Sequence, residues 1–153
     1  MNVLLYLTVL LLVFVGMEAI TWCTHKFIMH GFLWTLHVDH HQPHRGFFEK
    51  NDAFFLIFAV PSFLCILWGT LNGYYLLQAA GFGIMAYGAA YFLVHDVIIH
   101  RRFKWLSRLD HPYIRAIRIA HKMHHKHLDK HDGEAFGLLF VPRKYRRKSK
   151  IRK

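Results

Sequence analysis

Three long apolar blocks constrain what this chain can fold into. Residues 3–22 contain one charged side chain, Glu18, and residues 53–71 and 74–94 contain none. Each block reaches the roughly 17 to 25 residues that a helix needs to cross ~30 Å of hydrocarbon. A soluble domain would alternate apolar and polar residues along its elements instead of collecting them in blocks. The sequence therefore predicts an all-α integral membrane helical bundle with three transmembrane helices.

Outside these blocks the chain is polar and strongly basic. Its 153 residues include 20 Lys and Arg against 9 Asp and Glu, a formal net charge of +11, although 54% of all residues are hydrophobic. This combination argues against an ordinary soluble protein, a disordered chain and a disulfide-stapled secreted domain. The two cysteines, Cys23 and Cys65, lie at the edge and in the middle of apolar blocks. We interpret them as small apolar packing residues.

The basic residues predict how the helices are oriented. No charged side chain precedes the first block, whereas Lys26, Arg45 and Lys50 follow it, and basic residues at 101–102 and 143–153 follow the third. The positive-inside rule then places the N-terminus outside and every basic segment in the cytoplasm. Because the first block lacks a basic leader, we expect a retained helix and not a signal peptide. The prediction is one multi-pass domain, residues 1–153, in the cell membrane.

Asn72 and Gly73 separate the second and third blocks, and Asn-Gly is a strong turn signal. The two blocks therefore form a membrane hairpin, and the segments before residue 53 and after residue 94 emerge on the same face of the bilayer. These segments hold every histidine of the chain. The basic tail, residues 143–153, is a charge run that we predict to be too polar to pack. It would remain solvated or touch anionic lipid, with docking of an acidic protein as the alternative.

Ten of the 14 histidines repeat two spacings in the same order. Ahead of the hairpin, two histidines separated by four residues precede a triple, in which one histidine is followed after two residues by an adjacent pair. The same two patterns return behind the hairpin. The ten are His25, His30, His37, His40, His41, His95, His100, His121, His124 and His125. Because the hairpin brings both sets to one face, we predict a metal centre on His-bearing helical extensions in the cytoplasm.

Helix geometry gives the two spacings different uses. At 100° per residue, the members of the triple His37, His40 and His41 fall within about 100° of one another, so each triple can direct three imidazoles into one cavity. The second triple ends an amphipathic helix that we predict over residues 113–125. The two pairs whose members are separated by four residues, His25 with His30 and His95 with His100, behave differently. Their members lie five positions apart, which corresponds on an α-helix to a turn of ~140° and a rise of ~7.5 Å. They suit either ligands spread over two metals or a helix end that bends.

Ten histidines divide as five for each of two metals, which leaves about one open position on each for oxygen or water. Imidazole suits Zn, Cu, Fe and Ni, so residue type alone leaves the metal open. A ligand histidine usually passes its other ring proton to a carboxylate or a carbonyl. The candidates for such outer partners are Asp39, Asp96, Glu18 and His44.

Each candidate outer partner has a structural alternative. Asp39 and Asp96 suit a surface charge or a helix cap equally well. Glu18 lies ~10 Å deeper on the first helix, where a carboxylate must face protein, so it is alternatively a bundle hydrogen-bond acceptor or a protonated acid. His44, together with His111, His127 and His131, fits neither spacing, and we expect these four to be ordinary polar side chains.

The sequence encodes no site for an organic or iron–sulfur cofactor. No glycine-rich phosphate loop follows a strand, no cysteine quartet is present, and no Cys-x-x-Cys-His could attach haem. Gly81, Gly83 and Gly88 lie in an apolar block, where we expect them to permit close helix packing. Electrons for any redox chemistry would come from another protein, and an acidic donor would dock on the basic face.

The histidine boxes and their surroundings resemble the integral-membrane fatty-acid hydroxylase superfamily, and within it the bacterial β-carotene 3-hydroxylase family. The similarity covers about residues 10–145 and departs at His44 and at 126–130. The positions that carry it are Gly16–Glu18, His25–Gly31, His37–His41, Pro43, Gly46, Phe48, Glu49, Asn51, Asp52, Ala89–His100, Ala120–His125 and Phe136–Pro142.

This resemblance implies a di-iron centre with the ten histidines as ligands and O2 as co-substrate. It implies hydroxylation of the β-ionone ring at carbon 3, converting β-carotene through β-cryptoxanthin to zeaxanthin, with electrons from a ferredoxin and its reductase. The expected partners are thus a lipophilic carotenoid, the bilayer and an electron donor, with no nucleic acid. The alternatives are another histidine-box oxygenase (a fatty-acid or sterol hydroxylase, a desaturase or a carotenoid ketolase) and a non-enzymatic metal-binding membrane protein. The last would need ligands along a membrane path, and the hairpin has none.

Overall fold

The structure is a computed structural model that describes residues 2–42, 46–106 and 108–151, with side chains as far as Arg147. Every regular element in these ranges is a helix. Three helical stretches among them, residues 3–32, 50–72 and 75–99, are long and apolar enough to cross a membrane. The predicted all-α fold with three spans is confirmed. Each stretch also extends beyond the predicted apolar block, toward the histidines.

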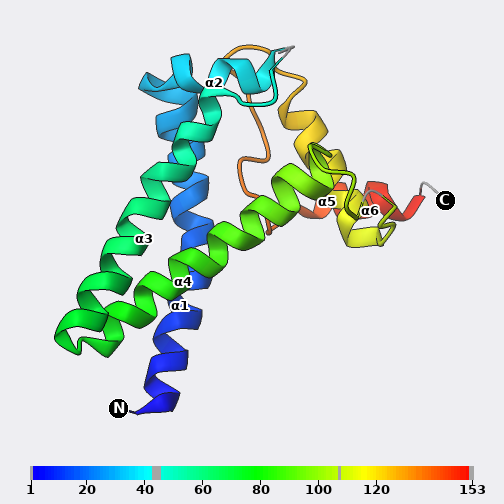
Figure 1. The fold of residues 1–153 in the computed structure, drawn as a ribbon. Coiled ribbons are helices and arrows are strands. Elements are labelled where there is room, and N and C mark those ends of the chain that lie inside the picture. The colour runs from blue at the N-terminus through cyan, green and yellow to red at the C-terminus, as the bar shows by residue number, and fades with distance from the viewer. Residues whose placement is uncertain (1, 43–45, 107, 152–153) are drawn as a thin grey trace.

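The membrane bundle consists of α1 (Val3–Cys23), α3 (Ala53–Asn72) and α4 (Tyr75–Phe92). The helix α4 packs against both α1 and α3, as Figure 1 shows. Gly73 ends α3 at a φ of 69°, a left-handed conformation that glycine adopts without a steric penalty. The predicted Asn-Gly turn of the hairpin is therefore present.

Small residues on α4 allow the three helices to approach closely. The Ser62 hydroxyl donates a hydrogen bond of 2.8 Å to the carbonyl of Gly81. A Cβ atom at Gly81 would lie 2.7 Å from the side chain of Ile66, and one at Gly83 would lie 2.7 Å from the carbonyl oxygen of Leu10. These two glycines permit close packing, as predicted. Gly88 does not, because a Cβ atom there would meet nothing within 4 Å.

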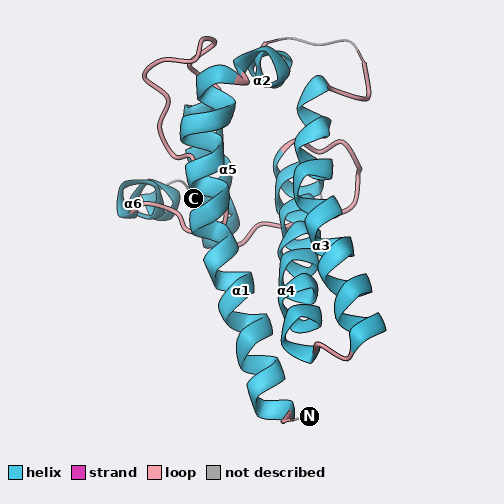
Figure 2. Cartoon of the chain, turned by 90° about the vertical axis from the view of Figure 1, so that its left-hand side faces the viewer, coloured by secondary structure: helices cyan, strands magenta, loops and turns pink. Residues whose placement is uncertain are grey.

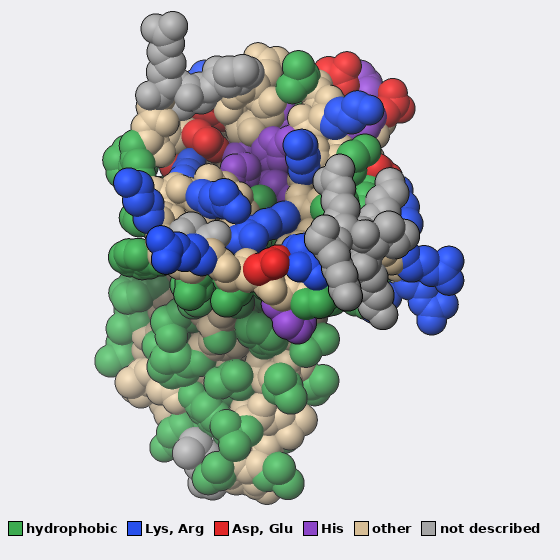
Figure 3. Space-filling view, turned by 90° about the vertical axis from the view of Figure 1, so that its right-hand side faces the viewer, with side chains coloured by type: hydrophobic (Ala, Val, Ile, Leu, Met, Phe, Trp, Pro, Cys, Tyr) green, Lys and Arg blue, Asp and Glu red, His purple; other side chains and the backbone are tan. Residues whose placement is uncertain are grey.

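The outer surface of the bundle is apolar. Large hydrophobic side chains on it are widely exposed; Leu71 on α3, for example, is 70% exposed and Phe63 61%. Figure 3 shows the consequence for the whole molecule: hydrophobic side chains cover the lower half, while Lys and Arg gather over the upper half. Such a large apolar surface is stable only when something other than water covers it, and a bilayer does so.

The histidine-bearing elements lie at the end of the bundle opposite the N-terminus (Figures 1 and 2). They are the π-helix η1 (Thr24–Phe32), α2 (Trp34–His41), the π-helix η3 (Leu93–Ile99) and α5 (Pro112–His124). The 3₁₀ helix η2 (Lys50–Asp52), which carries no histidine, precedes α3. The predicted amphipathic helix over residues 113–125 corresponds to α5, whose Ile117 is buried. The hairpin thus brings the two histidine-rich segments together.

The prediction for the basic tail was wrong in its described part. Residues Arg143–Ile151 form a helix, α6, which packs on α5. The contact is made by Tyr145, which is 1% exposed and joins the core formed by Ala116, Ile117 and Val141. One aromatic residue on one face of a helix is enough to anchor a segment whose remaining side chains are charged. The prediction considered only the net charge of the tail and therefore missed the contribution of Tyr145.

Candidate metal centre

The box histidines gather in two clusters. Among the described residues, two groups have ligand nitrogens that all lie within 4.8 Å of one another. The first cluster contains His25, His30, His37, His41 and His124, and the second contains His40, His95, His100 and His121. All nine side chains are buried except that of His100, which is half-buried. The tenth histidine, His125, lies beside the second cluster, with its ring 4.4 Å from the ring of His121.

The pair His25 and His30 lies on the π-helix η1, and the pair His95 and His100 lies at the end of the π-helix η3, of which His100 is the C-cap. In a π-helix the backbone N–H bonds the carbonyl five residues earlier, so side chains five positions apart come to the same side. The N–H of His100 makes this bond to the carbonyl of His95 at 2.9 Å. The rings of His95 and His100 are 4.5 Å apart, and those of His25 and His30 are 5.2 Å apart. Each pair belongs to one cluster, so its ligands are not spread over both; π-helical geometry, which neither predicted alternative named, brings the two rings together.

The triples are divided between the clusters, which corrects the prediction that each triple points into one cavity. On an α-helix, positions four apart differ by about 40°, whereas positions three apart differ by about 60° in the opposite direction. His37 and His41 therefore share a stripe of α2 that faces the first cluster, and His40 lies on the neighbouring stripe and joins the second. At the end of α5 the assignment is reversed. There, His124 faces the first cluster and His121 the second.

The same geometry places His125 with the second cluster, because it lies four positions after His121. Its Nε2 atom is buried and has no hydrogen-bond partner among the described residues. In both clusters the other Nε2 atoms converge: His25 lies 3.1 Å from His37, and His100 lies 2.8 Å from His121. Converging imidazole nitrogens with one orphaned member are the donor set that a transition metal requires. The residues present thus fit two metal ions.

The Nδ1 atoms of the first cluster point outward to neutral acceptors. His25, His30, His41 and His124 contact the backbone carbonyls of Phe136, Lys130, His127 and Glu134 at 2.8 to 3.3 Å. His37 instead contacts the side-chain oxygen of Asn51 at 2.7 Å. Because each acceptor requires an Nδ1–H donor, all five rings are held in the tautomer that leaves Nε2 free for a metal.

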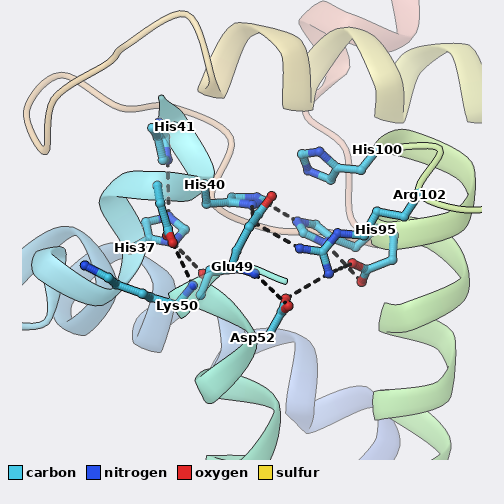
Figure 4. Close-up of polar contacts among 12 residues, drawn as sticks. His37, His40, His41, Glu49, Lys50, Asp52, His95, His100 and Arg102 are labelled. Carbon is cyan, nitrogen blue, oxygen red and sulfur yellow. Dashed lines mark hydrogen bonds and ion pairs between the residues drawn. The ribbon is translucent and has the colours of Figure 1, made fainter. Parts of the chain in front are cut away.

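The second cluster has charged partners, which Figure 4 shows. The His40 Nδ1 atom lies 2.7 Å from a Glu49 oxygen, and the His95 Nδ1 atom lies 3.3 Å from an Asp96 oxygen. Arg102 contacts both of these carboxylates. Burial lowers the pKa of His40 well below its ordinary value, so its contact with Glu49 is a hydrogen bond from a neutral ring.

Burial also favours the neutral form of His37, His41 and His124. It lowers the pKa of His37 to about 3, that of His41 to about 4 and that of His124 to about 2. The half-buried His100 follows the same trend, because burial lowers its pKa to about 3. Neutral imidazole is the form that binds a metal, so the centre is ready to bind at neutral pH.

The three predicted outer partners that the structure describes have different surroundings, and only one of them contacts a box histidine directly. Asp96 contacts a ligand histidine, as described above. Asp39 accepts the N–H of Lys50 at 2.6 Å, its other oxygen is buried without a partner, and it contacts no histidine of the described part. Glu18 accepts the backbone N–H groups of Leu138, Leu139 and Phe140 and the Tyr87 hydroxyl. His44 lies outside the described residues.

Sequence reasoning missed Asn51, Glu49 and Arg102 as partners of the centre. Glu49 and Asn51 lie in the stretch that carries the family resemblance, so a signal was present, although nothing in their spacing assigned them a ring. The backbone acceptors between residues 127 and 136 have no sequence signal, because any residue type offers a carbonyl. Of the histidines expected to be ordinary polar residues, His111 accepts the N–H of Tyr113 at the start of α5.

A cavity of about 570 Å³ lies below the metal centre, between α1, α3 and α4. Its wall is mainly apolar and aromatic, with Phe58, Ile66 and Met85 deep in the hairpin. At its polar end it reaches His95 and Asp96. This volume is in the range of small-molecule sites, which are typically ~300 to 1,000 Å³. A lipid-soluble molecule in the bundle would thus meet the second cluster.

The fatty acid hydroxylase family matches residues 10–142. The chain belongs to the fatty acid hydroxylase family. Among its curated relatives in that family, the "Beta-carotene hydroxylase" of Pantoea ananas is 42% identical over 130 residues, which cover 84% of this chain and 73% of the relative. That of Pseudescherichia vulneris is 38% identical over 135 residues, 87% of this chain and 75% of the relative.

A plant relative matches a smaller share of its own length. The "Beta-carotene 3-hydroxylase 2, chloroplastic" of Arabidopsis thaliana is 39% identical over 132 residues, which cover 84% of this fatty acid hydroxylase family member and 43% of the plant protein. No solved structure matches the chain significantly. The match of the family to residues 10–142 includes all ten box histidines.

The ligand assignment in this fatty acid hydroxylase family member predicts which histidines hold metal. His124 is fully buried in the first cluster, so His124→Ala should remove about half or more of the bound metal, because one site loses a ligand. Metal analysis of the purified full chain would measure this. His131→Ala is the matched control, and its metal content should equal that of the wild type. Unchanged metal in His124→Ala would refute the assignment.

Proposed function

We propose that this chain is an O2-dependent carotenoid β-ring 3-hydroxylase with two iron ions, one in each histidine cluster. The observation that carries the proposal is the apolar cavity in the membrane bundle, which ends at a ligand histidine. Bacterial relatives named beta-carotene hydroxylases, 38% and 42% identical over most of the chain, support the same substrate class. Zinc also suits imidazole ligands, but it has no redox chemistry, whereas iron has.

The reaction that we propose replaces one C–H bond at carbon 3 of the β-ring by C–OH. One atom of O2 enters the product, and the other leaves as water with two electrons and two protons. The same step on the second ring takes β-carotene through β-cryptoxanthin to zeaxanthin. Bound iron ions would supply the activation of O2 that a saturated ring carbon requires.

The chain's own residues bind the substrate, orient it and exclude water. A β-ring and part of its polyene would lie among aromatic side chains such as Phe54 and Phe58, which offer no hydrogen bond to water. The polar groups Asn51, Asp52 and Asp96 at the end of the cavity are engaged with His37, Arg102 and His95. They therefore do not have to be desolvated again when a hydrocarbon enters.

We propose that the electrons come from a ferredoxin-type donor and its reductase. Each hydroxylation consumes two electrons, and the sequence has no nicotinamide, flavin, haem or iron–sulfur site. The basic upper half of the molecule would attract an acidic donor (Figure 3). The alternative is another histidine-box oxygenase, which would use the same metal centre but bind a fatty acid or a sterol in the cavity.

The activity predicts a specific product and a specific requirement. Cells that make β-carotene should accumulate β-cryptoxanthin and zeaxanthin when they express this chain, as pigment chromatography would show. The purified chain should be inactive with NADPH alone and should turn over only with a ferredoxin and its reductase. Turnover with NADPH alone would reveal a missed cofactor site, and ketolated or desaturated pigment would identify one of the alternative oxygenases.

The cavity predicts where substrate selectivity lies. Gly88 lines the cavity, and a Cβ atom there would meet nothing within 4 Å, so Gly88→Leu should fold while its side chain occupies part of the cavity. We expect kcat/KM for β-carotene to fall about tenfold or more, with unchanged metal content. Gly16→Leu is the matched control, because Gly16 is an exposed glycine of α1 with the same open surroundings, and it should retain activity. Equal activity of the two variants would exclude this cavity as the substrate site.

We also propose that the chain lies in the cell membrane with the metal centre on the cytoplasmic side. The support is the charge distribution, because the basic residues and the histidine clusters share one end of the bundle (Figure 3). A reporter that is active only outside the cytoplasm should therefore be active when fused to the N-terminus and silent when fused after residue 153. The opposite pattern would reverse the orientation.

A further inference from the structure

The two clusters differ in the charge of the groups that hold their rings. All five Nδ1 atoms of the first cluster bond uncharged acceptors, namely four backbone carbonyls and the Asn51 amide. In the second cluster, the two Nδ1 contacts with side chains are to the carboxylates of Glu49 and Asp96. This difference is not visible in the spacing of the histidines, which is the same on both sides of the hairpin.

One arginine joins the carboxylates of the second cluster. The Arg102 guanidinium lies 3.2 Å from Glu49, 2.8 Å from Asp52 and 3.1 Å from Asp96, and its side chain is only 17% exposed. Asp52 in turn accepts the backbone N–H of Glu49 at 3.0 Å. Glu49 and Asp52 precede the membrane hairpin and Asp96 follows it, so Arg102 connects the two ends of the hairpin (Figure 4).

The backbone is bent to deliver this arginine. Arg101 has a φ of 55°, a left-handed conformation that costs a residue with a side chain of order 1 kcal/mol or more. The next residue, Arg102, donates its N–H to the carbonyl of Asp96 at 2.9 Å. The strained turn thus directs Arg102 back onto the end of η3, where its carboxylate partners are. Uncompensated, three neighbouring carboxylates would repel one another and rotate away from the rings.

The charges give this arrangement a consequence for a bound ion. Three carboxylates and one guanidinium leave a net charge of −2 around the neutral rings of the second cluster, which balances a divalent cation. Around the first cluster the contacts of the described rings supply no net charge. Since fixed charges act strongly in a buried site, the two ions would have unequal surroundings.

We propose that Arg102 is a positioning residue that holds Glu49 and Asp96 against His40 and His95, and so makes the second cluster the charge-compensated metal site of the pair. The proposal rests on the two-metal function proposed above. In the first cluster, Asn51 is the corresponding positioning residue, because its uncharged amide orients His37. Each metal site should then depend on its own outer residue and not on the other's.

A Co²⁺ titration of the metal-free full chain tests this independence, because imidazole-bound Co²⁺ absorbs visible light. The wild type should bind two equivalents in resolvable steps. Arg102→Gln should weaken one step by about 10- to 100-fold, the usual effect of removing an outer partner, and leave the other unchanged. Asn51→Ala should weaken the other step, and the double variant should show both losses additively.

Three further variants separate positioning from general stability. Glu49→Gln removes one charge while keeping an acceptor for His40, and it should weaken the same step as Arg102→Gln. Compared with Arg102→Gln, Arg102→Lys should restore part of that step, because it keeps the charge but lacks the two terminal nitrogens that contact Glu49 and the two aspartates separately. Arg115→Gln breaks the 2.9 Å ion pair of Arg115 with Asp110 elsewhere in the chain and should change neither step.

The outcomes distinguish the inference from the function on which it rests. If Arg102→Gln weakens both steps equally, or neither, or if Asn51→Ala weakens the same step, Arg102 does not position one site. If Arg102→Gln fails to fold, Glu49→Gln and Arg102→Lys decide the question by the same criterion. A wild type that binds no Co²⁺ would contradict the two-metal centre itself. A wild type that binds two equivalents of Co²⁺ but does not hydroxylate β-carotene when it is loaded with iron and supplied with ferredoxin and its reductase would contradict only the assigned reaction.

Discussion

Ten imidazoles gather in one region, eight of them buried, and a buried ring is stable there when it is neutral and both of its nitrogens have a partner or a ligand role. A charged ring loses its hydration when it is buried, so burial lowers the pKa of such a histidine far below its ordinary value, as for His37 and His124. A neutral ring has one donor and one acceptor nitrogen. With Nδ1–H bonded outward, Nε2 is left to converge with its neighbours. The fold therefore has to supply an acceptor for almost every ring.

The acceptors of the first cluster come largely from a segment without regular structure, and Glu18 holds that segment in place. Its carboxylate, within the first membrane stretch, accepts the N–H groups of Leu138, Leu139 and Phe140. Nearby in the chain, the Phe136 carbonyl accepts from His25. A carboxylate at membrane depth is costly unless protein surrounds it, and here three backbone donors and a tyrosine hydroxyl do so. Glu18 thus supports the histidine clusters indirectly, by holding the backbone segment whose Phe136 carbonyl orients His25.

The sequence predicts features that depend on composition and local period, and these were confirmed: the three spans, the Asn-Gly hairpin and the amphipathic α5. It does not predict features that depend on tertiary neighbours. The π-helical turns at His30 and His100 replace a geometry in which five positions diverge, and no residue type specifies them. The division of each triple follows from a 100° rotation per residue, but only once the position of the opposite triple is known. Arg102 acquires its partners through the hairpin, which no local pattern encodes.

The residues that orient the box histidines also line the cavity, so the proposed metal centre and the proposed substrate site share side chains. Asn51 and Asp96 line the polar end of the cavity while they hold His37 and His95, and Asp52 lines it while it holds Arg102. A substitution at this end, intended to admit a different ring, would disturb an acceptor that a buried imidazole requires. The residues of the deeper wall do not orient histidines, since Gly88 and Met85 make no hydrogen bond to a histidine of the described part. If the proposed function holds, substrate range in this fold can therefore change along the membrane hairpin while the end of the cavity beside the box histidines stays fixed.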